Sequence, residues 1–195
     1  MAQRVTFTKQ KIVEAAFDLT REKGWGFVTA RTLARKLGSS TMPLYSSLRS
    51  MEEIQTSVRG RAAQLMYDFQ RRAYTDNGLM NAAIGYVSFA REESNLFRFL
   101  YDRPDSPLQA LPSSARANTT PPHAFDVNGI YDLDDQPAAA IQDPMVLMNW
   151  IFVHGLASLV AGKVIELSED RISSLIQEAA ASFSMYQTYT KGETK

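Results

Sequence analysis

The segment from Thr29 to Tyr45 constrains the fold most, because it carries a small residue, a glycine and an apolar residue at fixed spacing. Ala34 is small enough for two helices to cross closely, and Gly38 tolerates the left-handed backbone of a tight turn. Leu44, six residues further on, can bury its side chain between the two helices. This spacing predicts a helix-turn-helix motif, with a generic helical hairpin as the alternative.

Charge is divided unevenly along a chain whose net charge is zero. Residues 1–50 contain nine Lys and Arg against three Asp and Glu, a net charge of +6, so residues 51–195 carry −6. A basic head on an acidic body suits a polyanionic partner for the head alone, with chance clustering of surface charge as the alternative. Together with the motif, the charge favours double-stranded DNA as a partner.

The composition argues against several other classes of protein. There is no Cys, so neither disulfides nor thiol chemistry are expected, and His123 and His154 are too far apart in sequence to suggest a metal site. No clustered His or Gly-rich phosphate loop points to an enzyme or a cofactor. No apolar run approaches the roughly 20 residues of a membrane span, and the N-terminus lacks an apolar signal core. We therefore expect a cytoplasmic protein without catalytic activity, cofactor or metal.

Apolar residues recur at helical spacing throughout, without strand alternation. We expect an all-α fold with an N-terminal three-helix helix-turn-helix DNA-binding domain (residues 1–50) and a C-terminal helical ligand-binding and dimerisation domain (residues 51–195). Trp25 and Phe27 are expected in the core of the first domain. The expected helices cover residues 8–23, 29–37, a short third segment to about 47, 50–74, 79–92, 94–101, 145–164 and a last segment after 168. The proline-rich stretch 102–144 predicts a long loop with short helical pieces.

The second helix of the motif is expected to enter the major groove by its N-terminal end. Four side chains would then lie nearest the bases: Ser39, Ser40, Thr41 and Met42. Hydroxyl groups exchange hydrogen bonds with base edges, and methyl groups contact thymine. Since this end has no Arg, Asn or Gln, we expect Arg31, Arg35 and DNA shape to contribute to recognition.

Other residues around the motif are candidates for contact with the DNA backbone. Pro43 falls in the first turn of the second helix, where a missing amide hydrogen is tolerated. Thr29 and the helix N-terminus at Ser50 are phosphate candidates, because helix N-termini attract anions. The hydroxyl of Tyr45 would point at a phosphate, although a packing role is an equally good interpretation.

Over residues 12–54 the chain resembles the TetR family of transcriptional regulators. The matching segments stand in the family's order and spacing: Ile12-Val-Glu-Ala-Ala16, Glu22-Lys-Gly24, Thr29 to Gly38, Leu44-Tyr45 and Glu52-Glu53-Ile54. The resemblance implies that Tyr45 and Thr29 contact the DNA backbone. The chain departs from the family where an aromatic is frequent, at Leu48, and where a Lys is frequent, at Met51. Arg49 is our candidate for the phosphate contact that this Lys makes.

The segment Trp150 to Leu159 resembles the Trp…His-Gly segment in a subset of TetR-like C-terminal domains. In those proteins this helix and the last one pair with their copies as a four-helix bundle around a two-fold axis. Small residues in this segment would allow such close approach, whereas an intramolecular core helix is the alternative. The expected dimer contacts are Gly155, Ser158, Leu159, Ile172, Leu175, Ile176, Ala179 and Phe183.

Aromatic residues with a few polar tips suggest a small-molecule site among the helices after Ser50. The candidate lining residues are Met66, Phe69, Tyr86, Phe89, Phe97, Phe99, Tyr101, Trp150 and His154. Each of them could equally be a core residue. The absence of charged residues on these faces favours an apolar or aromatic ligand.

Our leading hypothesis is a homodimeric DNA-binding transcriptional regulator, a repressor that a small apolar or aromatic ligand releases from a two-fold symmetric operator. The alternatives are a DNA-binding regulator without an effector, and a helical enzyme or interaction module.

Overall fold

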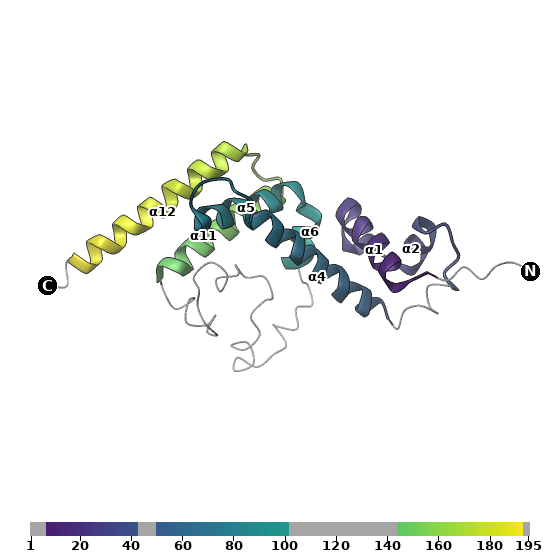
Figure 1. Cartoon of the computed structure of the whole chain (residues 1–195). Helices are drawn as coiled ribbons and strands as arrows, with labels where there is room; N and C mark the ends of the chain where they lie inside the picture. The colour runs from purple at the N-terminus through teal and green to yellow at the C-terminus, as the bar shows by residue number, and fades with distance from the viewer. Residues whose placement is uncertain (1–6, 43–49, 102–143, 193–195) are drawn as a thin grey trace, which may run out of the picture. The chain divides into compact units, whose positions relative to one another are not determined.

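A computed structural model describes residues 7–42, 50–101 and 144–192 of the chain. Within these ranges every regular element is a helix, which confirms the expected all-α class (Figure 1). The described helices fall into two compact units. One combines residues 1–65 with 93–103, and the other combines residues 66–92 with 104–195. The expected domain boundary at residue 50 stays a prediction.

The first unit contains α1 (Lys9–Lys23), the 3-10 turn η1 (Trp25–Phe27), α2 (Ala30–Lys36), most of α4 (Met51–Gln70) and α6 (Ser94–Tyr101). Its interior is formed by fully or almost fully buried side chains: Ile12, Ala16, Leu33, Ala34, Ile54 and Val58. Trp25 stacks on Phe99 with 5.0 Å between ring centroids. Phe27 was expected in the core, and this prediction is wrong, because its side chain is 40% exposed. The backbone after η1 turns Val28 inward instead.

Local hydrogen bonds set the helix ends as the sequence predicted. The Thr8 side chain accepts from the Lys11 amide to begin α1, and Gly24 ends it with a φ of 83°. The Ser50 hydroxyl accepts from the Glu53 amide at 3.1 Å, which caps α4. The Ser168 hydroxyl accepts from the Arg171 amide at 3.3 Å, which caps the last helix.

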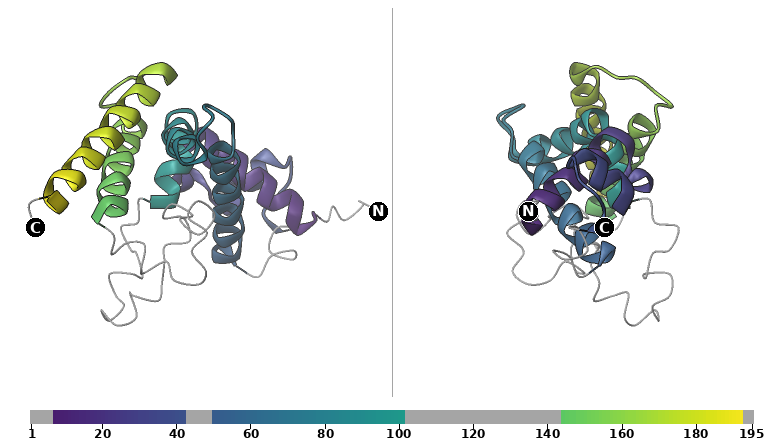
Figure 2. Two further views of the ribbon diagram at one scale, coloured as in Figure 1. Left: turned by 60° about the vertical axis from the view of Figure 1, so that its left-hand side comes forward. Right: turned by 90° about the vertical axis from the view of Figure 1, so that its right-hand side faces the viewer.

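The second unit contains the end of α4, α5 (Gly78–Glu92), α11 (Pro144–Ala161) and α12 (Glu169–Gly192). The central helix is α5, whose residues 82–90 are all buried. Helices α11 and α12 pack on α5 and lie side by side (Figure 2). None of the helices in the described ranges is long and apolar enough to cross a membrane.

One glycine sets how closely α5 approaches the end of α4. A Cβ atom built on Gly85 would lie 2.6 Å from the Cα of Gln70 and would also overlap the carbonyl of Phe69. Real Cβ atoms are not found so close to backbone, so only glycine fits this crossing. The second unit therefore depends on the absence of a side chain at position 85.

Candidate nucleic-acid interface and candidate effector site

The first half of the predicted helix-turn-helix is formed by α2 and the turn that follows it. Leu33 and Ala34 are buried, so the inner face of α2 is the one that the sequence predicted. The turn is closed by the Ser39 amide, which donates to the Ala34 carbonyl at 2.9 Å, and by Gly38 with a φ of 65°. Met42 is helical, and the rest of the second helix lies outside the described residues.

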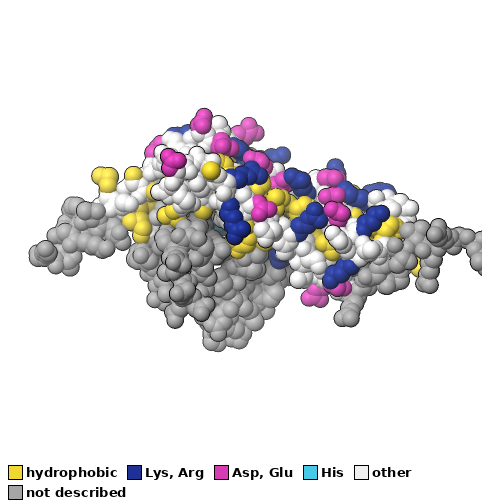
Figure 3. Space-filling model, viewed as in Figure 1, with side chains coloured by type: hydrophobic (Ala, Val, Ile, Leu, Met, Phe, Trp, Pro, Cys, Tyr) yellow, Lys and Arg dark blue, Asp and Glu magenta, His cyan; other side chains and the backbone are white. Residues whose placement is uncertain are grey.

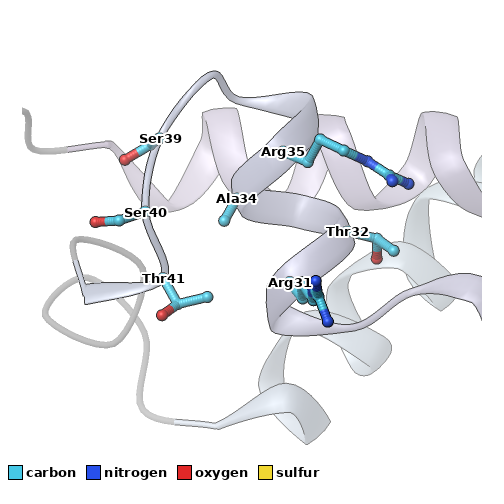
Figure 4. Close-up of a pocket in the computed structure, with 7 residues that line it drawn as sticks. All are labelled: Arg31, Thr32, Ala34, Arg35, Ser39, Ser40 and Thr41. Carbon is cyan, nitrogen blue, oxygen red and sulfur yellow. The ribbon is translucent and has the colours of Figure 1, made fainter.

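A hollow of about 450 Å³ lies between α2 and the segment after the turn. It is lined by Arg31, Thr32, Ala34, Arg35, Ser39, Ser40 and Thr41 (Figure 4). Ala34 points into the space between the two segments, whereas the Arg35 side chain extends away from the segment after the turn and the Ser39 and Ser40 hydroxyls point away from α2 (Figure 4). The structure thus brings together four predicted DNA contacts and Arg35, which was also expected to contribute to recognition, and it adds Thr32.

The charges around this hollow are positive. None of its lining residues is acidic. Within the described part of the chain, neither Arg31 nor Arg35 forms an ion pair. By contrast, the Nζ of Lys36, also on α2, lies 3.0 Å from Glu22 Oε1 and 3.8 Å from Asp18 Oδ2. Figure 3 shows Lys and Arg interspersed with Asp and Glu over α1 and α2.

Two predicted phosphate contacts are also helix caps. The Thr29 hydroxyl accepts from the Thr32 amide at 3.1 Å, and the Thr32 hydroxyl donates to the Phe27 carbonyl at 2.8 Å. Thr32 was missed from the sequence, although its place three residues after a threonine cap is the signal of a capping box. Ser50 is exposed and caps α4, and Met42 is 79% exposed. Three further predictions, Pro43, Tyr45 and Arg49, lie outside the described residues.

The predicted effector residues divide between the two units. Those in the first unit are Phe97, Phe99 and Tyr101; those in the second are Met66, Phe69, Tyr86, Phe89, Trp150 and His154. The ring of Phe99 contacts both Trp25 and the guanidinium of Arg59, which lies 4.6 Å from its centroid. Phe99 therefore has a packing role inside the first unit, where it contacts η1 and α4.

Two polar side chains, Tyr86 of α5 and His154 of α11, meet in the second unit where these helices pack together. The hydroxyl of Tyr86 and Nδ1 of His154 are 2.8 Å apart. The His154 ring stacks on Trp150, with 5.1 Å between centroids and 3° between planes. Burial lowers the pKa of His154, which favours the neutral imidazole. Trp150 Nε1 is buried and has no hydrogen-bond partner within the described ranges.

One face of α11 is exposed and apolar. Ile151 is 57% and Leu159 44% exposed, and Gly155 and Ser158 lie exposed between them. Leu175, Ala179 and Phe183 are only partly covered.

Two predicted dimer contacts require correction. Ile172 is fully buried and Ile176 is 4% exposed within a single chain. Because α12 packs against α5 and α11, these buried side chains belong to the interior of the second unit. Helical periodicity identified the apolar stripe of α12, but it could not show that other helices of the same chain bury these two residues.

Comparisons with known proteins show which proteins this chain is similar to. No family model matches the chain. An uncharacterized HTH-type transcriptional regulator of Bacillus subtilis (strain 168), YobS, is 24% identical over 101 residues, which are 50% of this chain and 53% of that protein. The chain thus spans about half the length of this curated relative. The crystal structure of a TetR-like transcriptional regulator from Rhodococcus sp. RHA1 matches with a TM-score of 0.59 and 18% identity over 88% of this chain and 92% of that one.

Proposed function

We propose that this chain, which has the fold of TetR-like transcriptional regulators, binds double-stranded DNA as a transcriptional regulator. The observation that carries the proposal is the hollow beside α2, which is lined by Arg31, Arg35 and four hydroxyl side chains at the turn of the predicted helix-turn-helix. Positive charge and hydroxyl groups close to one turn suit a polyanion whose bases must also be read. As a regulator of transcription it would act in the cytoplasm.

Two copies of the chain are needed for a two-fold symmetric operator, and the surface of α11 supports such a pairing. Ile151, Gly155 and Leu159 recur every four residues on one exposed face. An apolar stripe interrupted by a glycine allows two helices to pack closely. A homodimer would present two DNA-binding heads to half-sites one helical turn apart.

The second unit is our candidate for binding a small apolar or aromatic effector. Its interior contains the Tyr86–His154 pair, the Trp150 donor and a close edge-to-face contact between Phe69 and Phe89. Helix α4 belongs to both units, so a change at its C-terminal end can be passed to the DNA-binding segment. A ligand that favours the conformation with poor DNA affinity would release a repressor in proportion to that preference.

The first test is selection of the purified protein against random duplex DNA, followed by sequencing of the retained duplexes. Enrichment of a two-fold symmetric site is the expected result. A failure to enrich any sequence at low salt, where phosphate contacts are strongest, would contradict DNA-binding regulation and favour a helical enzyme or interaction module.

The effector is tested separately by thermal shift against a library of apolar and aromatic compounds, because a ligand of the folded state raises the melting temperature. A hit should also weaken binding to the selected duplex. A regulator without an effector would bind the duplex and respond to no compound.

A further inference from the structure

We propose that the second unit holds a polar binding site where α5 crosses the end of α4, and that this site takes a small molecule with a neutral carbonyl group. The carbonyl oxygen would be bound by three side chains: Gln70, Tyr74 and Ser88. This inference rests on the proposed function and specifies its effector, which would be an aromatic or apolar compound with a carbonyl group rather than a hydrocarbon.

The first argument is an accumulation of buried polar atoms without partners. Gln70 is 7% exposed and Ser88 is fully buried, yet neither Nε2 of Gln70 nor Oγ of Ser88 has a hydrogen-bond partner within the described ranges. The hydroxyl oxygen of Tyr74 is also buried and unpartnered there. Proteins pair nearly all buried polar groups, because an unpaired one gives up its hydrogen bonds to water without compensation. Three such groups at one helix crossing therefore indicate a site for a polar ligand.

The second argument is that one face of α5 brings these groups together. Asn81, Gly85 and Ser88 follow each other at intervals of four and three residues, so they lie on the same face of the helix. The Asn81 side chain accepts from the Tyr74 amide at 3.1 Å. The Gly85 position lies 2.6 Å from the Cα of Gln70, measured from a Cβ atom built on the glycine. Ser88 is the next residue of this face, one turn beyond the glycine.

The hydroxyls of Tyr74 and Ser88 are neighbours. Burial raises the pKa of Tyr74, and the charge of Arg72 and the hydroxyl of Ser88 oppose this rise, so both groups lie near the phenol. The guanidinium of Arg72 is 3.5 Å from the ring centroid of Phe69, and its side chain is exposed. A phenol with a raised pKa stays protonated at neutral pH, so Tyr74 keeps a proton to donate.

The chemistry of the three groups selects the ligand. Nε2 of Gln70 can only donate, and each hydroxyl has one proton to donate. A carbonyl oxygen offers two lone pairs, which suits the Gln70 amide and one hydroxyl, while the other hydroxyl donates to the first. None of the three side chains is charged, so a carboxylate would lose its hydration here without gaining a buried cation. A neutral acceptor fits these groups best.

An aromatic surface adjoins the polar groups. Phe69 precedes Gln70 on α4, and Phe89 follows Ser88 on α5. Both phenylalanine side chains are buried, and their rings meet edge to face with 5.6 Å between centroids. Each of the two helices thus contributes an aromatic residue beside a polar one. The rings would contact the apolar part of a ligand whose carbonyl group reaches the polar side chains.

The site is tested with compounds of matched shape on the full-length chain. Acetophenone is compared with α-methylstyrene, in which a CH₂ group replaces the carbonyl oxygen, and with benzoate; the corresponding naphthyl compounds extend the set. Affinities follow from the dependence of melting temperature on ligand concentration. We expect the ketones to bind at least about tenfold more tightly than the hydrocarbons, which leave the buried donors unpaired. The carboxylates should bind more weakly than the ketones.

Two substitutions separate a binding role from a structural one. Ser88→Ala and Gln70→Met should each abolish the preference for ketones. They should also raise the melting temperature of the ligand-free protein by about 2–4 °C, because each removes an unpaired buried group. Ser57→Ala is the matched control within a helix, since the Ser57 hydroxyl donates to the Glu53 carbonyl at 2.9 Å. This control should keep the preference for ketones and show no such rise.

A direct readout is the side-chain amide resonance of Gln70, assigned by its loss in Gln70→Met. Acetophenone should shift this resonance in the wild type and in Ser57→Ala, whereas α-methylstyrene at the same concentration should not. Because a residue that only supports the fold does not distinguish the two compounds, this measurement reports contact with the carbonyl group.

Several outcomes would overturn the inference. A melting temperature that falls in both Ser88→Ala and Gln70→Met would show that water or another group already pairs these side chains. A preference for ketones that survives in both variants would place the acceptor elsewhere, and a failure of every ketone to bind would exclude the site. Binding of hydrocarbons or carboxylates in preference to ketones would overturn this inference and leave an effector of another class. Absence of any DNA binding in the selection would instead count against the proposed function itself.

Discussion

The guanidinium of Arg21 on α1 forms two hydrogen bonds with the carboxylate of Glu93 beside α6, with Nε 2.7 Å from Oε2 and Nη2 bonded to Oε1. Only 6% of the Glu93 side chain is exposed. The Asn95 side chain adds a hydrogen bond of 3.0 Å to the Arg21 carbonyl. Helix α6 follows α5 directly in sequence, yet these contacts fix it to α1 in the first unit.

Loss of Arg21 is expected to destabilise the fold, because it leaves the buried Glu93 carboxylate without its cation. Breaking a buried pair costs about 3–5 kcal/mol, and we discount this to about 1–2 kcal/mol because the Arg21 side chain is 54% exposed to water. Urea denaturation of Arg21→Ala should show the decrease in the free energy of unfolding. Arg171→Ala removes an exposed pair with Glu178 and should leave the free energy of unfolding nearly unchanged. Equal effects of the two substitutions would contradict the special role of the Arg21–Glu93 pair.

Gly85→Ala is expected to destabilise the second unit, because the new Cβ would collide with the backbone at Phe69 and Gln70. Overpacking against rigid backbone costs about 1–3 kcal/mol or more, so the melting temperature should fall by several degrees. Gly60→Ala gives a matched control inside α4, since nothing lies within 4 Å of a Cβ there. Alanine is the better helix former, so this variant should gain up to about 1 kcal/mol. A neutral Gly85→Ala would mean that α4 and α5 approach less closely than the structure indicates.

Helix positions were predictable because their signals are local. Thr8, Thr29 and Ser168 cap the expected helices with their own side chains. Helix ends differ from the prediction where side chains further along the chain accept hydrogen bonds from the backbone amides. Helix α4 was expected to reach Tyr74 but ends at Gln70, because the amides of Tyr74 and Thr75 donate instead to Asn81 at the start of α5.

The candidate sites were predictable in part for the same reason. The spacing of Ala34 and Gly38 predicted the turn beside the hollow, and all residues that line the hollow lie within positions 31–41. The grouping of α6 with α1 was not predictable, because Arg21 and Glu93 are 72 residues apart and nothing local pairs them. Similarly, the apolar stripe of α12 does not itself reveal whether α5, α11 or a second chain covers it.

The stability of the protein should depend on pH through His154. Burial holds its folded-state pKa below the ordinary 6.5, so the unfolded chain takes up a proton first as the pH falls. The free energy of unfolding should therefore be unaffected by this group at higher pH and decrease as the pH drops through 6.5. Denaturation between about pH 7.5 and about pH 5.5, above the range of ordinary carboxylates, measures the effect.

Substitution of His154 separates its contribution to the pH dependence of stability from the contributions of other titrating groups. His154→Gln should flatten the dependence on pH even if its lost contacts with Trp150 and Tyr86 lower stability at every pH. The chain has only one other histidine, His123, and His123→Gln measures what that group contributes. A pH dependence that survives in His154→Gln and disappears in His123→Gln would show that the buried histidine is not responsible.

The proposed dimer predicts that a charge on the exposed face of α11 separates the subunits. Ile151→Glu would place a carboxylate in an apolar contact, where it would lose its hydration without gaining a partner. Sedimentation should therefore give a dimer for the wild type and a monomer for this variant. Val164→Glu is the control, because Val164 is 69% exposed and lies beyond the end of α11. A wild type that sediments as a monomer at micromolar concentration, or an Ile151→Glu variant that remains a dimer, would exclude this face as the interface.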